Sequence, residues 1–193
     1  MPSSGTAGTA TTISVQARDQ FGNTVTVGGA TVVVTVTGAN AATPAVTDNG
    51  NGTYSTSYTP TNAGTDNIAI TLNSVAVAGS PFTSTVSGTG TVSPSLSTVA
   101  VSPSTITASA GTSQSTITVT VKDQFGNPIS GATVVLAATG SGNTLTQPVG
   151  TTNSSGVATG TLSSTAATPK TVSATANGTG ITQTQVVTVN PAA

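Results

Sequence analysis

The chain consists of two related halves, and this internal repeat constrains its fold more than any other feature. The pentapeptide "DQFGN" occurs at 19–23 and again at 123–127, 104 positions later. The stretch "GGATVVV" at 28–34 matches "SGATVVL" at 130–136 at an offset of 102, and the offset returns to 104 at Gly52 and Gly156. For 193 residues, this repeat predicts two domains of about 100 residues each.

Short runs in which Val, Ile and Ala alternate with polar residues fill both halves. In the run 11–17, Ile13, Val15 and Ala17 alternate with Ser14 and Gln16, a period of two that is typical of a half-buried strand. Turn residues separate the runs, and no segment reads as a helix. The runs are 11–17, 30–38, 52–60, 67–72 and 75–86, and then 97–101, 115–121, 131–139, 156–164, 171–176 and 182–189. They predict an all-β protein with two tandem β-sandwiches.

The boundary between the halves is predicted in the Gly- and Ser-rich stretch "SGTGTVSPSLS" at 87–97. We place the first domain at 1–88, a linker at 89–95 and the second domain at 96–193, and leave open whether the first domain holds its complete first strand. Val92 and Leu96 are the sizeable apolar residues of this stretch and are expected to pack at the joint. Pro103 interrupts the first strand of the second domain, which suits an edge strand that changes sheets.

Charged residues are so scarce that several classes of function are excluded. The chain has no His and no Cys, so zinc sites, thiolate sites, disulfides and the usual hydrolase triads cannot form. Three basic residues cannot neutralise a run of phosphates, which excludes nucleic acid as the main partner. We therefore predict no enzymatic activity and no cofactor. The seven charged residues are Arg18, Asp19, Asp48, Asp66, Lys122, Asp123 and Lys170.

The composition also bears on the environment of the protein. No apolar stretch reaches the roughly 18 residues that a membrane helix needs, so no direct membrane insertion is expected in this part. The start "MPSSGTAGTA" lacks the basic end and apolar core of a signal peptide, as expected for a segment of a longer protein. Charge depletion with abundant Thr favours an extracellular or secreted protein. We also expect this part of the chain to be a monomer.

The first half resembles a filamin-type immunoglobulin repeat over most of residues 7–86. The residues that carry the resemblance are "AGTATTISVQARDQFGN", "VTDNGNGTYSTSYTPTNAGTDNIAI" and "VAVAGSPFTSTV". Where that family usually has an aromatic residue two positions after Gly64, this chain has Asp66, in step with Ile68 and Ile70. The resemblance implies an immunoglobulin-like sandwich. As a family, such repeats accept a partner strand on an open sheet edge.

The second half resembles a bacterial group 1 immunoglobulin-like domain of the invasin and intimin kind over about 96–190. It carries "VAVSPSTITASAGTSQSTITVTVKDQFGNPISGATVVL" and "TTNSSGVATGTLSS". Such domains resemble beads in long bacterial surface proteins, which implies an extracellular bacterial setting. By analogy, the pair serves as a stiff, adhesion-related spacer whose partners are the neighbouring repeats of the same polypeptide.

The two "DQFGN" copies are interpreted as structural turns rather than as ligand loops. The carboxylates accept backbone N–H groups, the Phe residues close the end of each core, and the Gly-Asn steps take positive φ angles. "DNGNGT" at 48–53 offers a single acid, too few for calcium, and is expected to be a hairpin turn. The residues assigned to the two turns are Asp19, Phe21, Gly22, Asn23, Asp123, Phe125, Gly126 and Asn127.

A sheet edge is the remaining candidate binding site. The run "TVVVTVT" at 31–37 is uncharged, and Val32, Val34 and Val36 could contact a protein strand that adds to the edge. A glycan ligand is the other binding alternative, although only five aromatic side chains could stack on a sugar. A third alternative is an accessory domain of a secreted enzyme. We expect the spacer role, with a protein or glycan ligand as the rival.

Overall fold

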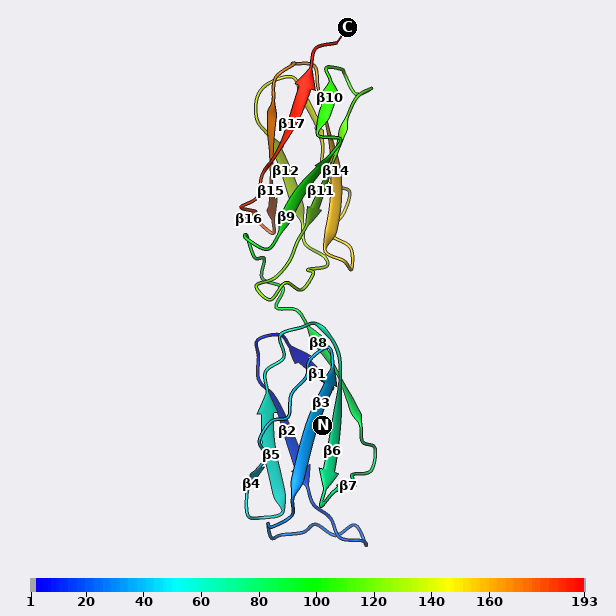
Figure 1. The fold of residues 1–193 in the computed structure, drawn as a ribbon, viewed down its shortest axis with the longest axis vertical. Coiled ribbons are helices and arrows are strands. Elements are labelled where there is room, and N and C mark those ends of the chain that lie inside the picture. The colour runs from blue at the N-terminus through cyan, green and yellow to red at the C-terminus, as the bar shows by residue number, and fades with distance from the viewer. Residues whose placement is uncertain (1–2, 193) are drawn as a thin grey trace. The chain divides into compact units, whose positions relative to one another are not determined.

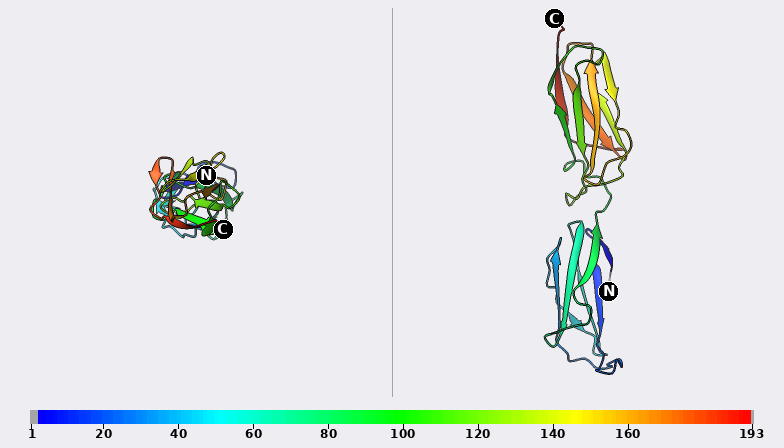
Figure 2. Two further views of the ribbon diagram at one scale, coloured as in Figure 1. Left: turned by 90° about the horizontal axis from the view of Figure 1, so that it is seen from above. Right: turned by 90° about the vertical axis from the view of Figure 1, so that its right-hand side faces the viewer.

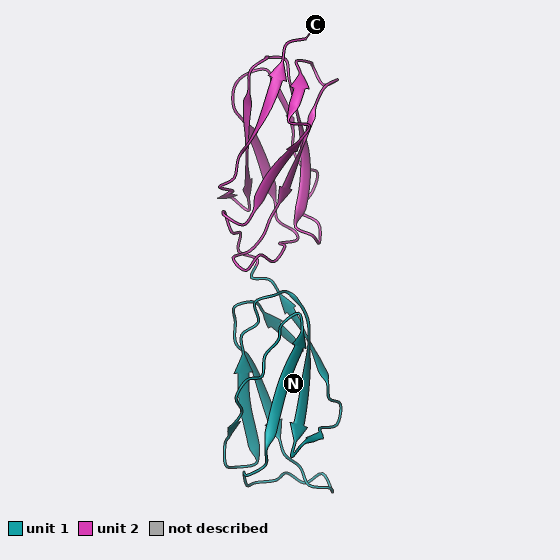
Figure 3. Cartoon of the chain, in the orientation of Figure 1, with its two compact units in different colours: residues 1–89 teal, residues 90–193 magenta. Residues whose placement is uncertain are grey.

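A computed structural model describes residues 3–192 as β-strands joined by turns. The chain divides into two compact units, residues 1–89 (unit 1) and residues 90–193 (unit 2) (Figure 3). In each unit the strands form two facing layers, the arrangement predicted from the period of two (Figure 2). No helix in the described part of the chain is long and apolar enough to cross a membrane.

Unit 1 contains a larger and a smaller sheet (Figure 1). Its strands are β1 (Ser4–Thr6), β2 (Thr11–Gln16), β3 (Val32–Gly38), β4 (Thr47–Asp48), β5 (Thr53–Tyr58), β6 (Gly64–Leu72), β7 (Val75–Ala76) and β8 (Phe82–Ser87). The larger sheet has the order β1-β8-β6-β3, with β7 paired to β6, and the smaller has the order β2-β5-β4. β2 and β3 therefore each lie at an edge of a sheet.

Unit 2 repeats this topology with one additional strand. Its strands are β9 (Thr98–Ser102), β10 (Thr105–Thr107), β11 (Ser115–Thr120), β12 (Val134–Ala138), β13 (Asn143–Thr146), β14 (Val157–Ser164), β15 (Lys170–Ala176), β16 (Thr179–Gly180) and β17 (Gln185–Asn190). One sheet has the order β10-β17-β15-β12, with β16 paired to β15, and the other has the order β13-β14-β11-β9. When the strands of unit 2 are matched in order with those of unit 1, β9 has no counterpart among residues 3–89.

The expected change of sheet at Pro103 is confirmed. β9 pairs antiparallel with β11, and after Pro103 the chain continues as β10, which pairs parallel with β17 of the other sheet. Proline has no N–H to donate to a ladder, so it sits between the two pairings rather than within either. Of the two apolar residues in 87–97, Val92 is buried in the core of unit 2, whereas Leu96 is exposed.

The cores consist mainly of β-branched side chains from facing strands. In unit 1, Ile13 of β2, Val34 of β3 and Ile68 of β6 are completely buried, while their sequence neighbours face outward. In unit 2, Ile117 and Val119 of β11 and Leu162 of β14 are likewise completely buried. Val and Ile suit a pleated surface because their χ1 angles lose little freedom there. The alternation seen in the sequence therefore translates directly into an inner and an outer face.

A polar network replaces the aromatic residue expected beside Gly64. Asp66 is completely buried on β6, and its carboxylate accepts hydrogen bonds from Tyr58 OH at 2.8 Å and from Asn40 N at 2.8 Å. Asn40 Nδ2 also donates to both carboxylate oxygens at 3.1 Å. A buried carboxylate is costly unless donors surround it, and these donors come from two separate segments. Asp66 thereby ties β5 and the 39–42 turn to β6.

Alkaline pH should weaken unit 1 through this network. Burial, the hydrogen bond to Asp66 and the charge of Asp66 raise the pKa of Tyr58 to about 12, above the value of about 10 in an unfolded chain. A group whose pKa is raised by folding contributes stability that is fully present below its pKa in the unfolded chain. This stability is lost as the pH rises through its pKa in the folded protein. The free energy of unfolding of unit 1 should therefore fall by about 1–2 kcal/mol between about pH 10 and 12.

Denaturant unfolding of the variant Tyr58→Phe at several pH values checks this expectation. The variant should lose most of the alkaline fall in the free energy of unfolding. At neutral pH it should be about 1–3 kcal/mol less stable than the parent chain, because Asp66 loses a donor. Tyr54→Phe is the matched control, since Tyr54 OH accepts from Ala30 N at 3.0 Å rather than bonding to a carboxylate. An alkaline fall that persists in Tyr58→Phe would contradict the assignment.

Candidate functional site

The two "DQFGN" segments form the same hydrogen-bonded turn. In unit 2, Asp123 Oδ1 accepts from Phe125 N and Asn127 N, both at 2.9 Å, and Asp123 Oδ2 accepts from Asn127 Nδ2 at 3.1 Å. In unit 1 the equivalent bonds to Asp19 are 2.8, 2.9 and 2.9 Å. Both carboxylates thus fold the chain around themselves, and the geometry favours a structural role over ligand binding.

Positive φ angles close both turns. Gly22 and Gly126 have φ values of 84° and 86°, a conformation that costs glycine little but strains other residues. Hydrogen bonds from the side chain and the backbone N–H of Asn23 hold the pKa of Asp19 below its usual value. Each turn therefore depends on an aspartate, a glycine and an asparagine acting together.

Our expectation that both Phe side chains close a core is wrong for Phe21. Phe21 is 79% exposed, whereas Phe125 is half-buried. The carboxylates differ in the same direction, because Asp123 is completely buried and Asp19 is exposed. The pentapeptide determines the turn in both places, but the surroundings of the turn determine how much of it is covered.

The "DNGNGT" segment is a hairpin turn whose polar groups already have partners. Asp48 Oδ1 accepts from Gly50 N at 2.8 Å and Asp48 Oδ2 accepts from Gly29 N at 2.6 Å. Asn51 Oδ1 accepts from Thr53 N at 3.1 Å. Within residues 3–192 no group of three or more potential acidic, His or Cys ligands is found. Calcium needs about six to eight oxygen ligands, which this turn does not supply.

The edge strand β3 does not present the side chains that were assigned to a partner. Val32, Val34 and Val36 are buried and face the core, because they occupy the inward positions of the period-two pattern. Val33 is 43% exposed and faces outward with Thr35 and Thr37. The backbone of Val36 already pairs with Ala42 on the outer side of β3. An added strand could therefore pair only with the rest of this edge, and it could not contact the three valines.

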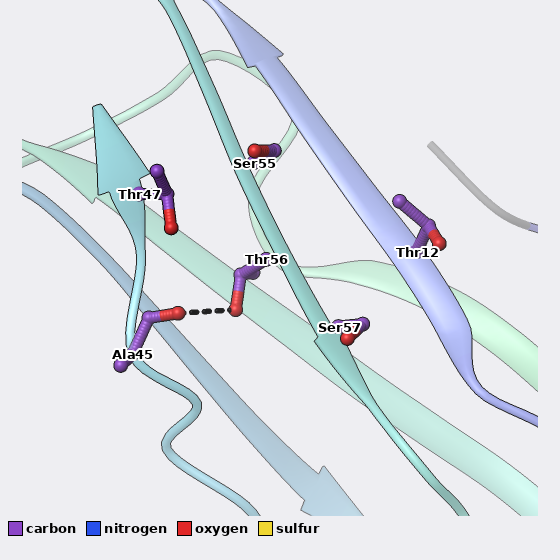
Figure 4. A pocket seen from close by; sticks show the side chains of 6 residues that line it. All are labelled: Thr12, Ala45, Thr47, Ser55, Thr56 and Ser57. Atoms are coloured by element: carbon purple, nitrogen blue, oxygen red, sulfur yellow. Dashed lines mark hydrogen bonds between the residues drawn. The ribbon is translucent and has the colours of Figure 1, made fainter. Parts of the chain in front are cut away.

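A shallow, hydroxyl-lined depression of about 330 Å³ lies on the outer face of the smaller sheet of unit 1 (Figure 4). Thr56 Oγ1 donates to Ala45 O at 2.7 Å, and no aromatic or charged side chain lines it. Sugar sites commonly add stacking on an aromatic ring to their hydrogen bonds, and this depression offers no ring. The lining residues are Thr12, Ala45, Thr47, Ser55, Thr56 and Ser57.

The sequence contained partial signals for the polar features that we did not predict. The outward Ser and Thr of "TTISVQ" and "TYSTSY" indicate a hydroxyl-rich face. Asp66 alternates in register with the inward residues Ile68 and Ile70, which indicates a buried carboxylate. Lys170 gave the same signal, because it alternates in step with Val172, Ala174 and Ala176. It is completely buried, and its Nζ donates to Ser141 O at 2.8 Å and to Thr168 Oγ1 at 2.9 Å. These bonds fix the loop before β13 and show no catalytic arrangement.

Family models match both halves of the chain. Residues 2–83 match the filamin/ABP280 repeat, and residues 96–190 match the bacterial Ig-like domain (group 1). An inverse autotransporter adhesin of Escherichia coli K12, YeeJ, is 40% identical over 77 residues. These residues are 40% of this chain but 3% of that protein. Both resemblances noted from the sequence are confirmed.

Solved structures of bacterial surface proteins share the fold. Invasin, described as a bacterial integrin-binding protein, matches with a TM-score of 0.71 and 23% identity over 98% of this chain and 38% of its own. InvD of Yersinia pseudotuberculosis matches with a TM-score of 0.67 and 22% identity, over 99% of this chain and 56% of its own. The Escherichia coli adhesin FdeC matches with a TM-score of 0.61 and 24% identity, over 97% of this chain and 61% of its own. The predicted pair of immunoglobulin-like sandwiches is confirmed, and the chain spans part of each relative.

The different burial of the two Phe residues leads to a stability prediction. Phe125→Ala should destabilise unit 2 by about 1–2 kcal/mol, because a half-buried ring loses part of its apolar contact. Phe21→Ala is the matched variant and should change unit 1 by less than about 0.5 kcal/mol. Denaturant titrations followed by the NMR amide signals of each unit give both values. Equal losses in the two units would contradict the difference in burial.

Calcium should have no effect on either unit. Since the two oxygens of Asp48 already accept backbone N–H groups, a calcium ion at "DNGNGT" would have to displace these bonds. Thermal unfolding in calcium chloride and in a chelator should give the same midpoint. An upward shift of several degrees with calcium would show that the turn is a metal site.

Proposed function

Because the chain joins a filamin-type repeat to a group 1 bacterial immunoglobulin-like domain, we propose that it is a mechanical spacer in a longer bacterial surface protein. The observation that carries the proposal is the parallel pairing of a strand near the entry of each unit with the last strand of that unit. In unit 2, β10, which follows β9 directly, lies parallel to β17. In unit 1, β1 and β8 are paired in the same way.

Parallel terminal strands resist extension for a geometric reason. When the two ends of a unit are pulled apart, β10 and β17 are drawn along their own axes in opposite directions. The hydrogen bonds between them, including Thr188 N to Ser104 O and Ala108 N to Asn190 O, both 2.8 Å, are then sheared together. Breaking several bonds at once requires more force than opening them one after another. Each unit thus has a mechanical clamp at its ends.

The relatives support an adhesion-related place for this spacer. YeeJ is named an inverse autotransporter adhesin and FdeC an adhesin, and both are proteins of Escherichia coli. We propose that this chain likewise belongs to an extracellular bacterial adhesin and separates a ligand-binding part from its anchor. Neighbouring repeats of the same polypeptide would be its direct partners. The integrin binding of invasin is a property of that protein and is not proposed for this chain.

A binding role receives less support from the described residues. The valines of β3 face the core, and the hydroxyl-lined depression offers no ring for a sugar to stack on. Of the five aromatic residues, Tyr54 and Tyr58 are buried. An accessory role beside a catalytic domain would use the same scaffold, but no side-chain arrangement among residues 3–192 points to a polymer substrate. The spacer remains the function that the geometry favours.

Single-molecule stretching tests the proposed clamp in unit 2. Thr188→Pro removes the bond from Thr188 N to Ser104 O within the terminal pair. Its loss should cost at least about 1 kcal/mol of stability and should lower the unfolding force clearly. Thr139→Pro is the control, because Thr139 N donates to Thr171 O and Thr139 Oγ1 accepts from Thr171 N, both between β12 and β15. Since it removes two bonds, this control should cost at least as much stability but affect the force less. Equal effects on force would argue against the clamp.

A further inference from the structure

Two charged side chains of opposite sign occupy the same position in the two units. Asp66 near the start of β6 and Lys170 at the start of β15 are 104 residues apart, which is the offset of the internal repeat. Both are completely buried and alternate in step with the inward apolar residues that follow them. Equivalent places in two related cores therefore hold a negative group in one unit and a positive group in the other.

The strands that carry these charges are otherwise matched in their pairing. β6 pairs with β3 and β15 pairs with β12 in the same register, since Leu72 lies opposite Val32 as Ala176 lies opposite Val134. The inward positions after the charged residue are apolar in both strands. They are Ile68, Ile70 and Leu72 in β6, and Val172, Ala174 and Ala176 in β15. By register and by apolar pattern, each strand would suit the sheet of the other unit.

The turn after each strand is also built in the same way. Asn73 Oδ1 accepts from Thr31 N at 2.8 Å, and Asn177 Oδ1 accepts from Thr133 N at 2.9 Å. Both asparagines have a φ of 48°. This end of the strand is therefore alike in the two units, and the charged end is where they differ.

In unit 1 the buried charge is surrounded by donors. The carboxylate of Asp66 accepts from Asn40 N, Asn40 Nδ2 and Tyr58 OH. The side-chain amide of Asn40 is held in this orientation, because its Oδ1 accepts from Thr61 N at 2.9 Å and from Asn62 N at 3.0 Å. The N–H groups of Asn40 thus stay directed at position 66, where they require an acceptor.

In unit 2 the equivalent charge is surrounded by acceptors. Lys170 Nζ donates to Ser141 O at 2.8 Å and to Thr168 Oγ1 at 2.9 Å. At the offset of 104, Tyr58 corresponds to Leu162, whose side chain has no polar group. Since a backbone carbonyl cannot donate, a carboxylate in this place would lack the donors that it has in unit 1.

Neighbouring repeats of related sequence are prone to one particular folding error. Strands of one repeat can pair with those of the next, because their patterns agree and the linker keeps them at a high effective concentration. In this chain the loops before β6 and before β15 are equivalent points for such an exchange. β6–β8 would then join β9–β14, and β15–β17 would join β1–β5. The result would be two hybrid sandwiches in place of the two native units.

The buried charges would be mismatched in both hybrids. Asp66 would face Ser141 O and the side chain of Leu162, neither of which is a donor. Lys170 would face the N–H groups of Asn40. A buried charge that loses its partners is strongly destabilising, whereas each of these charges has hydrogen-bond partners in its own unit. The two charges therefore disfavour the hybrids far more than the native pair of units.

We propose that Asp66 and Lys170 are specificity residues that prevent the exchange of strands between the two units as the chain folds. They act together, because one charge penalises each of the two hybrids. Single buried polar residues fix the pairing of strands or helices in this way in other proteins, at a cost in stability. The inference rests on the two units of this chain and is independent of the spacer role.

Pairs of introduced cysteines report which strands lie side by side, since the chain has no cysteine of its own. Thr35 of β3 lies opposite Ala69 of β6, and Ser173 of β15 is the equivalent of Ala69. Thr35→Cys with Ala69→Cys gives a disulfide in the native fold, whereas Thr35→Cys with Ser173→Cys gives one after exchange. Each full chain is unfolded, refolded at low concentration, oxidised and resolved on a non-reducing gel.

Removal of both charges should increase the exchange. In Asp66→Asn with Lys170→Met, the disulfide between positions 35 and 173 should rise by about tenfold or more over the chain that keeps both charges. Ile68→Val with Val172→Ala is the matched control, because it weakens both cores at the next inward positions and changes no charge. Its disulfide between positions 35 and 173 should stay at the level of the parent chain.

Exchange of the two charges should reverse the preference. In Asp66→Lys with Lys170→Asp, both native units are mismatched. The hybrids, by contrast, place a carboxylate beside Asn40 and Tyr58 and an ammonium group beside Ser141. The disulfide between positions 35 and 173 should then become the main product. If this variant does not fold, it gives neither disulfide, and the charge-free variant decides the question.

The proposal fails if the charge-free chain and the parent chain give the same amount of disulfide between positions 35 and 173. It also fails if the core control raises this amount as much as removal of the charges does. A folded chain with exchanged charges that forms the native disulfide alone would likewise overturn it. None of these results depends on the unfolding force of unit 2, so failure of this inference and failure of the spacer role remain distinguishable.

Discussion

The burial of small, β-branched side chains between two sheets is the constraint on which the rest of this protein depends. Most inward positions hold Val, Ile, Ala or Leu, although those of β5 hold Tyr and Thr, and charged residues are almost absent from the chain. Each side chain contributes modestly, so both cores rely on an unbroken alternation along every strand. A strand that shifted by one residue would turn its valines outward and its threonines inward. The alternation therefore sets the register as well as the fold.

The few carboxylates stabilise bends rather than provide chemistry. Asp19 and Asp123 each hold a "DQFGN" turn, and Asp48 holds a hairpin through two backbone N–H groups. Asp66 is buried and joins three segments at one end of unit 1. Since hydrogen bonds within the protein already engage their oxygens, these residues offer little to a metal or a substrate. This use of its only acids is consistent with a protein whose role is to keep its shape under load.

Strand edges, by contrast, are where the described parts of the two units differ. Both units pair a strand near their entry in parallel with their last strand. Unit 2 covers the edge of β11 with β9, and among residues 3–89 no strand pairs with the equivalent edge of β2.

The sequence by itself determined the fold class, the two units and their turns. Alternation is local, and a turn such as Asp123 to Asn127 closes through bonds within five residues, so neither depends on distant parts of the chain. Pro103 likewise indicated the change of sheet, because proline cannot donate within a ladder. Only the tertiary structure decided which faces are covered. Identical pentapeptides leave Phe21 exposed and Phe125 half-buried, and the valines of β3 proved to be core rather than edge contacts. Burial depends on what another strand brings to the same place, and that information lies far away in the sequence.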